Sequence, residues 1–226
     1  MMKIAVVGDV HNDVDTIMVY CDKLAEVGFD VLIAMGDFID YNVPKGFTKE
    51  DMGRLIIEEL SVFSKPIIAV PGNFDKDLMP MFEKMGIDLH GKGKVIKGVG
   101  FYGFGGAKTP FNTPLEPSEE ETEDGLKKGF GMLKKCDATI QITHNPPART
   151  KVDALYTGAH VGSEAVRKFI EKNQPTVAVS AHIHEARGTD VLGKTKLINA
   201  GRFPEGYCGL ITIKGKEAEV EVVNLI

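Results

Sequence analysis

Histidine, aspartate and asparagine side chains recur after the apolar stretches of this chain, in a combination that binds divalent metal ions. Asp9 and His11 follow residues 2–7, and Asp37 follows residues 30–35. Four of the 6 histidines belong to the full set, which is Asp9, His11, Asp37, Asn73, His144, His182 and His184. Nitrogen and oxygen ligands without thiolate suit Mn, Fe, Zn, Ni or Co. Seven side chains are too many for one tetrahedral site, so we predict two metal ions that share a carboxylate.

The stretches before these side chains have the composition of buried β-strands, being apolar and rich in β-branched residues. There are five of them, at residues 2–7, 30–35, 66–70, 138–142 and 176–180. Open α/β sheets bind their ligands at the carboxyl ends of their strands. We therefore expect the strand ends to bring the seven side chains together. Alternate residues of an extended backbone point the same way, so Asp9 and His11 should face one point.

Helical patterns separate the first strands. Asn12 and Asp13 can cap a helix that Gly28 ends, and Thr48 begins a helix to about Leu60 with a capping-box pattern. Alternating strands and helices predict a parallel sheet covered by helices.

The second half of the chain has a different pattern. Short strands over residues 95–104 should pair in an antiparallel manner, and an acidic run ending at Asp124 should begin a helix to about Lys135. Another helix should begin after Ser163. From about residue 190 onward, short strands separated by glycines predict a β-meander that forms a second sheet.

The composition is that of a globular protein, with 43% hydrophobic and 26% charged residues. A length of 226 residues suits a single domain, over residues 1–226. The net charge of −5 gives no general attraction for nucleic acid or for an anionic membrane, and we expect neither as a partner. No apolar run approaches the roughly 20 residues of a membrane span. The 3 cysteines are widely spaced and no signal-peptide pattern is visible, so we expect a cytoplasmic protein; its oligomeric state is not encoded in any recognisable motif.

Five blocks of sequence carry a specific resemblance. They are Gly8-Asp9-x-His11, Gly36-Asp37-x-x-Asp40, Gly72-Asn73-x-Asp75, His144 before Pro146-Pro147, and His182-x-His184. In this order they resemble the motifs of the calcineurin-like metallophosphoesterases, over residues 4 to about 202. Further similarity, in Gly105-Gly106 and Gly162-Ser163 among others, resembles the small branch related to cyclic-nucleotide phosphodiesterases.

The resemblance implies a fold, a ligand set and an activity. The fold would be α/β (α+β), a four-layer α/β/β/α sandwich of two mixed sheets flanked by helices. One divalent ion would be bound by Asp9, His11, Asp37 and His184. The other would be bound by Asp37, Asn73, His144 and His182, so that Asp37 bridges; we expect Mn²⁺ first, with Fe, Zn, Ni or Co as alternatives. A metal-bound hydroxide would then hydrolyse a small phosphate ester, with phosphodiesters expected first.

One position departs from the family pattern. Many members carry a histidine directly after the asparagine, where this chain has Phe74. Protonation of the leaving group would then fall to His160, to water or to no group. His160 lies in a glycine-containing loop before a helix start, and a surface histidine is an equally reasonable interpretation. The expected catalytic residues are thus Asp37, Asn73 and His160, with Asp75 orienting a ligand or Asn73 from behind.

A binding or scaffold protein of the same fold, catalytically weak or inactive, is the alternative. Such proteins are expected to lose metal ligands first. Every ligand position of this chain is filled, which favours the enzyme.

Overall fold

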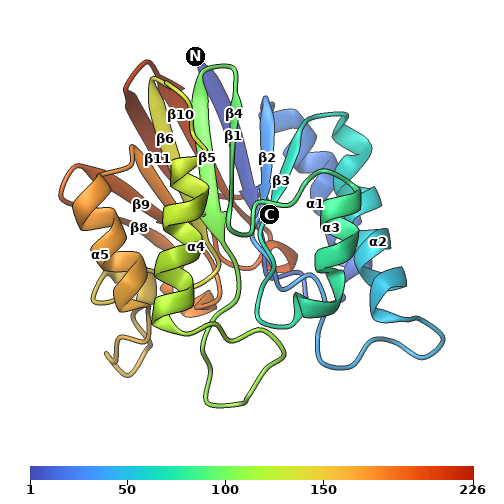
Figure 1. The fold of residues 1–226 in the computed structure, drawn as a ribbon. Helices are drawn as coiled ribbons and strands as arrows, with labels where there is room; N and C mark the ends of the chain where they lie inside the picture. Colours follow the sequence, from blue (N-terminus) through green and yellow to red (C-terminus); the bar gives the residue numbers. More distant parts are fainter.

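Two mixed β-sheets lie face to face in the computed structural model, which describes residues 1–226, and helices cover both outer faces (Figure 1). The strand orders are β11-β10-β1-β2-β3 and β4-β5-β6-β7-β9-β8. This is the α/β/β/α sandwich that the family resemblance implies. None of the helices combines the length and apolar character that a bilayer crossing requires.

The first sheet is built on the apolar runs of the N-terminal half. Its strands are β1 (Met2–Val7), β2 (Val31–Ala34), β3 (Ile67–Ala69), β10 (Tyr207–Lys214) and β11 (Glu217–Asn224). β1, β2 and β3 are parallel, as predicted. They are covered by α1 (Val14–Val27), α2 (Lys49–Leu60) and α3 (Met79–Lys84).

The helix starts follow the predicted capping residues. The Asp13 carboxylate accepts a hydrogen bond from the N–H of Thr16 at the start of α1, and Thr48 forms a capping box with Asp51 at the start of α2. The short α3 and the 3₁₀ turn Asp75–Leu78 before it were not anticipated.

The second sheet contains the remaining strands. They are β4 (Lys92–Ile96), β5 (Val99–Phe104), β6 (Ala138–Thr143), β7 (Val177–Ser180), β8 (Gly188–Leu192) and β9 (Thr195–Asn199). β4 and β5 are antiparallel, as predicted. The covering helices are α4 (Glu119–Gly131), which ends before the predicted Lys135, and α5 (Glu164–Asn173).

The prediction of a C-terminal meander that forms its own sheet is wrong. β8 and β9 pair with each other, but β9 also pairs in parallel with β7 and so belongs to the second sheet. β10 and β11 also pair, yet β10 lies antiparallel to β1 in the first sheet. Turn residues specify the local hairpins, whereas burial of β9 and β10 selects the strands that they pair with on the inner side, β7 and β1.

The two sheets are joined by a shared apolar core. Ile4, Val6 and Ile33 of the first sheet belong to the same buried cluster as Ile140 and Val179 of the second. This packing holds the sheets in one relative position. Loops that leave β1, β2, β3, β6 and β7 then meet at one edge, the lower one in Figure 1.

Two glycines allow the loops after β2 and β3 to touch. A Cβ atom on Gly36, whose φ is +86°, would lie 2.2 Å from the nitrogen of Gly72. A Cβ on Gly72 would lie 2.1 Å from Oδ1 of Asp37. Such distances are far inside van der Waals contact, so neither position accommodates a side chain without moving the loops.

We predict that Gly72→Ala lowers the free energy of unfolding by about 1–3 kcal/mol, because backbone and the Asp37 carboxylate must both move. Denaturant unfolding measures this. Gly131→Ala is the matched control, since a Cβ there meets nothing within 4 Å and alanine favours the helix by up to about 1 kcal/mol. Equal stability of Gly72→Ala and the unmodified protein would contradict the close approach.

Candidate metal centre

Six of the seven predicted ligands form two clusters at the loop edge of the sandwich. Within each cluster, one ligand atom from each residue lies within 4.8 Å of the others. The first cluster is Asp9, His11 and His184, and the second is Asp37, His144 and His182.

Asp37 lies between the clusters. Its Oδ2 is 3.3 Å from Nε2 of His144 and 3.9 Å from Nε2 of His11, which belongs to the other cluster. Burial alone would raise the pKa of this carboxyl, but His144, His11 and His182 outweigh that effect and lower the pKa to about 2. An ionised carboxylate in contact with both clusters has the position that a shared ligand needs.

Asn73 lies next to Asp37, because the following residue, Phe74, is hydrogen-bonded to the Asp37 carboxylate. The N–H of Phe74 donates to Oδ1 of Asp37 over 3.1 Å. Asn73 is only 1% exposed, and its Oδ1 has no hydrogen-bond partner. The same is true of Oδ1 of Asp9 and Nε2 of His144. Each unsatisfied buried group costs about 1–3 kcal/mol. Unpaired nitrogen and oxygen atoms of this kind are ligands for divalent cations, so these residues could hold metal ions.

Hydrogen bonds on the far side of two imidazoles fix their orientation. Nδ1 of His11 is 2.6 Å from Oδ1 of Asp40, and Nδ1 of His144 is 2.6 Å from the carbonyl oxygen of Met35. Because Nδ1 donates in each case, Nε2 is the nitrogen that faces the centre, where it can bind an ion when it carries no proton. Nε2 of His11 also lies 3.3 Å from Nε2 of His184.

The backbone at the centre is not extended. Asp9, His11, Asp37 and His182 have φ values of 53°, 52°, 48° and 69°. The expectation that Asp9 and His11 converge along an extended strand is therefore wrong, although both belong to one cluster. The chain turns after β1 because the N–H of Asp9 bonds to Gly36 and that of His11 to Asp37. Left-handed conformations of this kind cost about 1–3 kcal/mol each and are typical of functional sites.

Asp75 ties two ligand loops together, which gives it a supporting position. Its buried carboxylate accepts hydrogen bonds from the N–H groups of Phe38, Ile39 and Gly72. Burial and the neighbouring Asp37 raise the pKa of Asp75 to about 7 in spite of these bonds. Asp75 acts on backbone segments beside Asp37 and Asn73 and touches no ligand side chain through these bonds.

The position where a histidine was expected is apolar. The ring of Phe74 contacts that of His11 edge to face, with centroids 6.0 Å apart, and offers no proton donor. His160 lies outside both clusters. Its loop nevertheless contacts the segment that contains His182 and His184, since the N–H of Tyr156 donates to the carboxylate of Glu185.

Sequence reasoning missed two supporting carboxylates. Asp40 is the last residue of the Gly36-Asp37-x-x-Asp40 motif, and its contact with His11 spans 29 residues. Asp153, which contacts His160, belongs to none of the motifs. An acidic residue at the end of the β2 motif was a signal for Asp40; no pattern pointed to Asp153.

The fold and this geometry agree with the comparison to known families. The family model of the calcineurin-like phosphoesterases matches residues 2–186. The chain therefore belongs to the calcineurin-like phosphoesterases.

One relative and several solved structures are similar to this chain over nearly its whole length. Protein MJ1162 of Methanocaldococcus jannaschii is 32% identical over 214 residues, covering 91% of this chain and 90% of that protein. TT1561 of Thermus thermophilus has a TM-score of 0.73 at 19% identity and covers 100% of this chain and 99% of its own. A dimetal phosphatase from Danio rerio has a TM-score of 0.63 at 11% identity, covering 100% and 96%. An archaeal phosphodiesterase has 0.56 at 16%, covering 98% and 100%. At these identities the three structures share the fold.

We predict that Asp40→Ala weakens binding of the first metal ion by about 10–100-fold, because His11 loses the partner that orients its ring. Titration of the metal-free protein with Mn²⁺ measures the affinity. Asp77→Ala removes an exposed carboxylate that pairs only with Lys49 and serves as the control. Unchanged affinity in Asp40→Ala would exclude this role.

Proposed function

We propose that this protein is a dinuclear metal-dependent phosphoesterase that hydrolyses phosphodiesters. The observation that carries the proposal is the Asp37 carboxylate in contact with histidines of both clusters, at 3.3 and 3.9 Å. Two proteins of the same fold, a dimetal phosphatase and an archaeal phosphodiesterase, add support for the class of reaction.

The proposed ligand sets follow the two clusters. Asp9, His11, Asp37 and His184 would hold one ion, and Asp37, Asn73, His144 and His182 the other. Mn²⁺ is our first choice, with Fe, Zn, Ni or Co as alternatives. When bound, such ions neutralise charge on the phosphoryl oxygens and lower the pKa of a coordinated water to about 7.

The chain's own residues then have separate tasks. Asp37 would hold both ions, and Asn73 would supply its unpaired amide oxygen to one of them. Phe74 cannot donate a proton, so we assign protonation of the leaving oxygen to His160. Asp40 and Asp75 keep the ligand loops in place through the hydrogen bonds described above.

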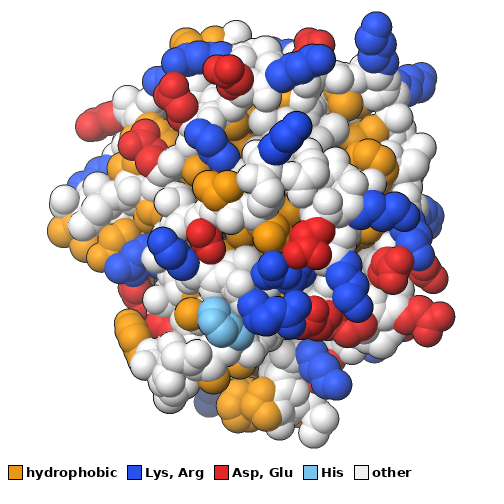
Figure 2. All heavy atoms as spheres, turned by 90° about the vertical axis from the view of Figure 1, so that its left-hand side faces the viewer, with side chains coloured by type: hydrophobic (Ala, Val, Ile, Leu, Met, Phe, Trp, Pro, Cys, Tyr) orange, Lys and Arg blue, Asp and Glu red, His pale blue; other side chains and the backbone are white.

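The proposed substrate is a small phosphate ester. The proposed compartment is the cytoplasm, because the three cysteines of the protein, Cys21, Cys136 and Cys208, are free thiols, which suits a reducing environment. We do not propose nucleic acid as a partner, in line with the net charge of −5. On the face seen in Figure 2, basic and acidic side chains are interspersed.

A catalytically weak binding or scaffold protein remains the second candidate, and Phe74 is the observation that favours it. We predict that the Mn²⁺-loaded protein hydrolyses an aryl phosphodiester and that Asp37→Ala reduces the rate by at least about 10²-fold. Asp77→Ala should retain full activity. A Mn²⁺-loaded protein with no rate above that of Asp37→Ala would favour the binding protein instead.

We further predict that aryl phosphodiesters react faster than alkyl phosphodiesters. Phenolate departs with little need of a proton, whereas an alkoxide depends on a general acid, which contributes about 10²–10⁴-fold. Initial rates for a matched aryl and alkyl pair measure the preference. Equal rates for the two esters would contradict this preference.

A further inference from the structure

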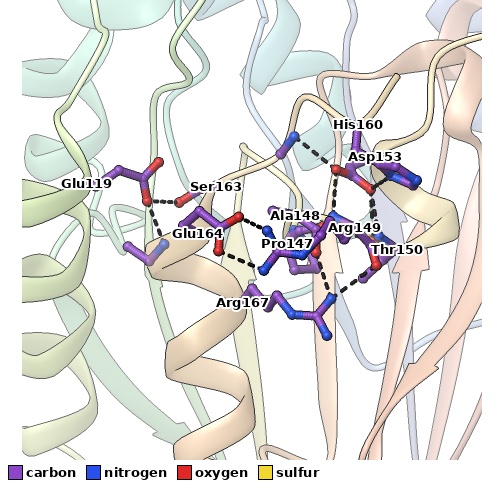
Figure 3. Close-up of polar contacts among 12 residues, drawn as sticks. Glu119, Pro147, Ala148, Arg149, Thr150, Asp153, His160, Ser163, Glu164 and Arg167 are labelled. Carbon is purple, nitrogen blue, oxygen red and sulfur yellow. Dashed lines mark hydrogen bonds and ion pairs between the residues drawn. The ribbon is translucent and has the colours of Figure 1, made fainter. Parts of the chain in front are cut away.

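A buried carboxylate with an unusual number of donors lies in the loop between β6 and α5. Asp153 is 0% exposed, and its two oxygens accept hydrogen bonds from the N–H groups of Arg149, Thr150 and Gly162 over 2.7–3.0 Å. Oδ1 also lies 2.7 Å from Nδ1 of His160 (Figure 3). His160 itself is on the surface, with 40% of its side chain exposed.

The loop that carries this pair, residues 147–163, is fastened at its base. The N–H of Ser163 donates to Pro146, and that of Ala148 donates to Ser163. From α4, the Glu119 carboxylate accepts from the Ser163 hydroxyl over 2.8 Å. From α5, the Arg167 guanidinium donates to the carbonyl oxygens of Ala148 and Arg149 (Figure 3). These contacts give the loop a fixed conformation.

The same loop lies against the segment that holds two proposed ligands. The Asn199 side chain donates to the carbonyl oxygens of Ile183 and Val152, over 2.9 and 3.4 Å. Ile183 stands between His182 and His184, and Val152 directly precedes Asp153. One amide therefore connects the metal-binding segment to the Asp153–His160 pair.

The hydrogen bonds of Asp153 determine the state of the imidazole. Burial alone would raise the pKa of the Asp153 carboxyl, but His160 and the N–H groups of Thr150, Gly162 and Arg149 outweigh it and lower the pKa. A carboxylate that is ionised near neutral pH requires a proton on Nδ1 of His160. Nε2 is then the nitrogen that gains and loses protons, as in other Asp–His pairs.

We propose that Asp153 is a positioning residue that orients His160 to protonate the leaving oxygen of the substrate, a role that rests on the proposed phosphodiesterase function. As the bond between phosphorus and the leaving oxygen breaks, the Nε2 proton passes to that oxygen. Water supplies the oxygen of the new bond to phosphorus and releases a proton to solvent. Solvent then returns a proton to Nε2, which its exposure permits. Asp153 stabilises the imidazolium form of His160 before the transfer. After the transfer it keeps the remaining proton of the imidazole on Nδ1.

The test compares leaving groups in the Mn²⁺-loaded, full-length protein. The substrates are aryl phosphodiesters that run from nitrophenyl to unsubstituted phenyl, the poorer leaving group. We expect His160→Gln to lower kcat for the phenyl ester by about 10²-fold, and for the nitrophenyl ester by less than about tenfold, with KM little changed. Asp153→Asn should show the same selectivity with a smaller loss. The double variant should equal His160→Gln, because Asp153 acts through His160.

Arg149→Gln is the control on the same loop, since it removes only an exposed ion pair with Glu164 and should leave the leaving-group dependence unchanged. Losses that multiply in the double variant, or equal losses for both esters in Asp153→Asn, would overturn the proposal. If the unmodified protein hydrolyses no ester with any of the five metals, the proposed function fails instead.

A second measurement covers the case in which Asp153→Asn does not fold. Nitrogen NMR of ¹⁵N-histidine-labelled protein loaded with Zn²⁺ reports the tautomer of each neutral imidazole, and the His160→Gln spectrum assigns the signal. We expect His160 to carry its proton on Nδ1. A proton on Nε2 with Nδ1 bare would show that Asp153 does not hold the ring as proposed.

Discussion

Burial of the Asp37 carboxylate is the constraint on which the rest of the site depends. An isolated ionised carboxylate is very costly to remove from water, so it must be surrounded by positive groups and donors. Here Nε2 of His144 lies 3.3 Å away and the N–H of Phe74 donates over 3.1 Å. These partners come from the ends of β6 and β3, while Asp37 follows β2. Three strands from both sheets must therefore end within a few ångströms of one carboxylate, which only a fixed packing of the two sheets achieves.

The local structure around Asp37 follows from that requirement. The loops after β2 and β3 approach so closely that Gly36 and Gly72 leave no space for a Cβ. Asp75 then binds the N–H groups of both loops, which would otherwise be buried without partners. The left-handed φ values at Asp9 and Asp37 occur in the same region, where the N–H of Asp9 donates to the carbonyl oxygen of Gly36 and that of His11 to Asp37. The energy of these strained residues is offset by the apolar core between the sheets.

Much of this arrangement could be predicted from residues 2–180, because each buried strand is a continuous apolar run and each ends in a chemically distinctive residue. The prediction of the C-terminal strands was wrong because contacts between distant parts of the chain determine which sheet each hairpin joins. The hairpins β8–β9 and β10–β11 were visible locally, but not the sheets that they join. The turn at Asp9 and His11 depends on hydrogen bonds to Gly36 and Asp37, which no local sequence pattern predicts. Asp40 and Asp153 have roles only because folding brings them to the far nitrogens of two histidines.

Phe74 shows how a change at one position shifts the demand onto another part of the fold. The apolar ring of Phe74 packs against the imidazole of His11 and has no proton to donate to a leaving group. In the proposed phosphoesterase, a side-chain proton donor would then come from a different loop, and that loop would need a fixed conformation. The loop of residues 147–163 meets that condition, since α4, α5 and Asn199 fasten it by side-chain hydrogen bonds. Without a chemical task nearby, an exposed histidine would gain little from a buried carboxylate that three backbone N–H groups already satisfy.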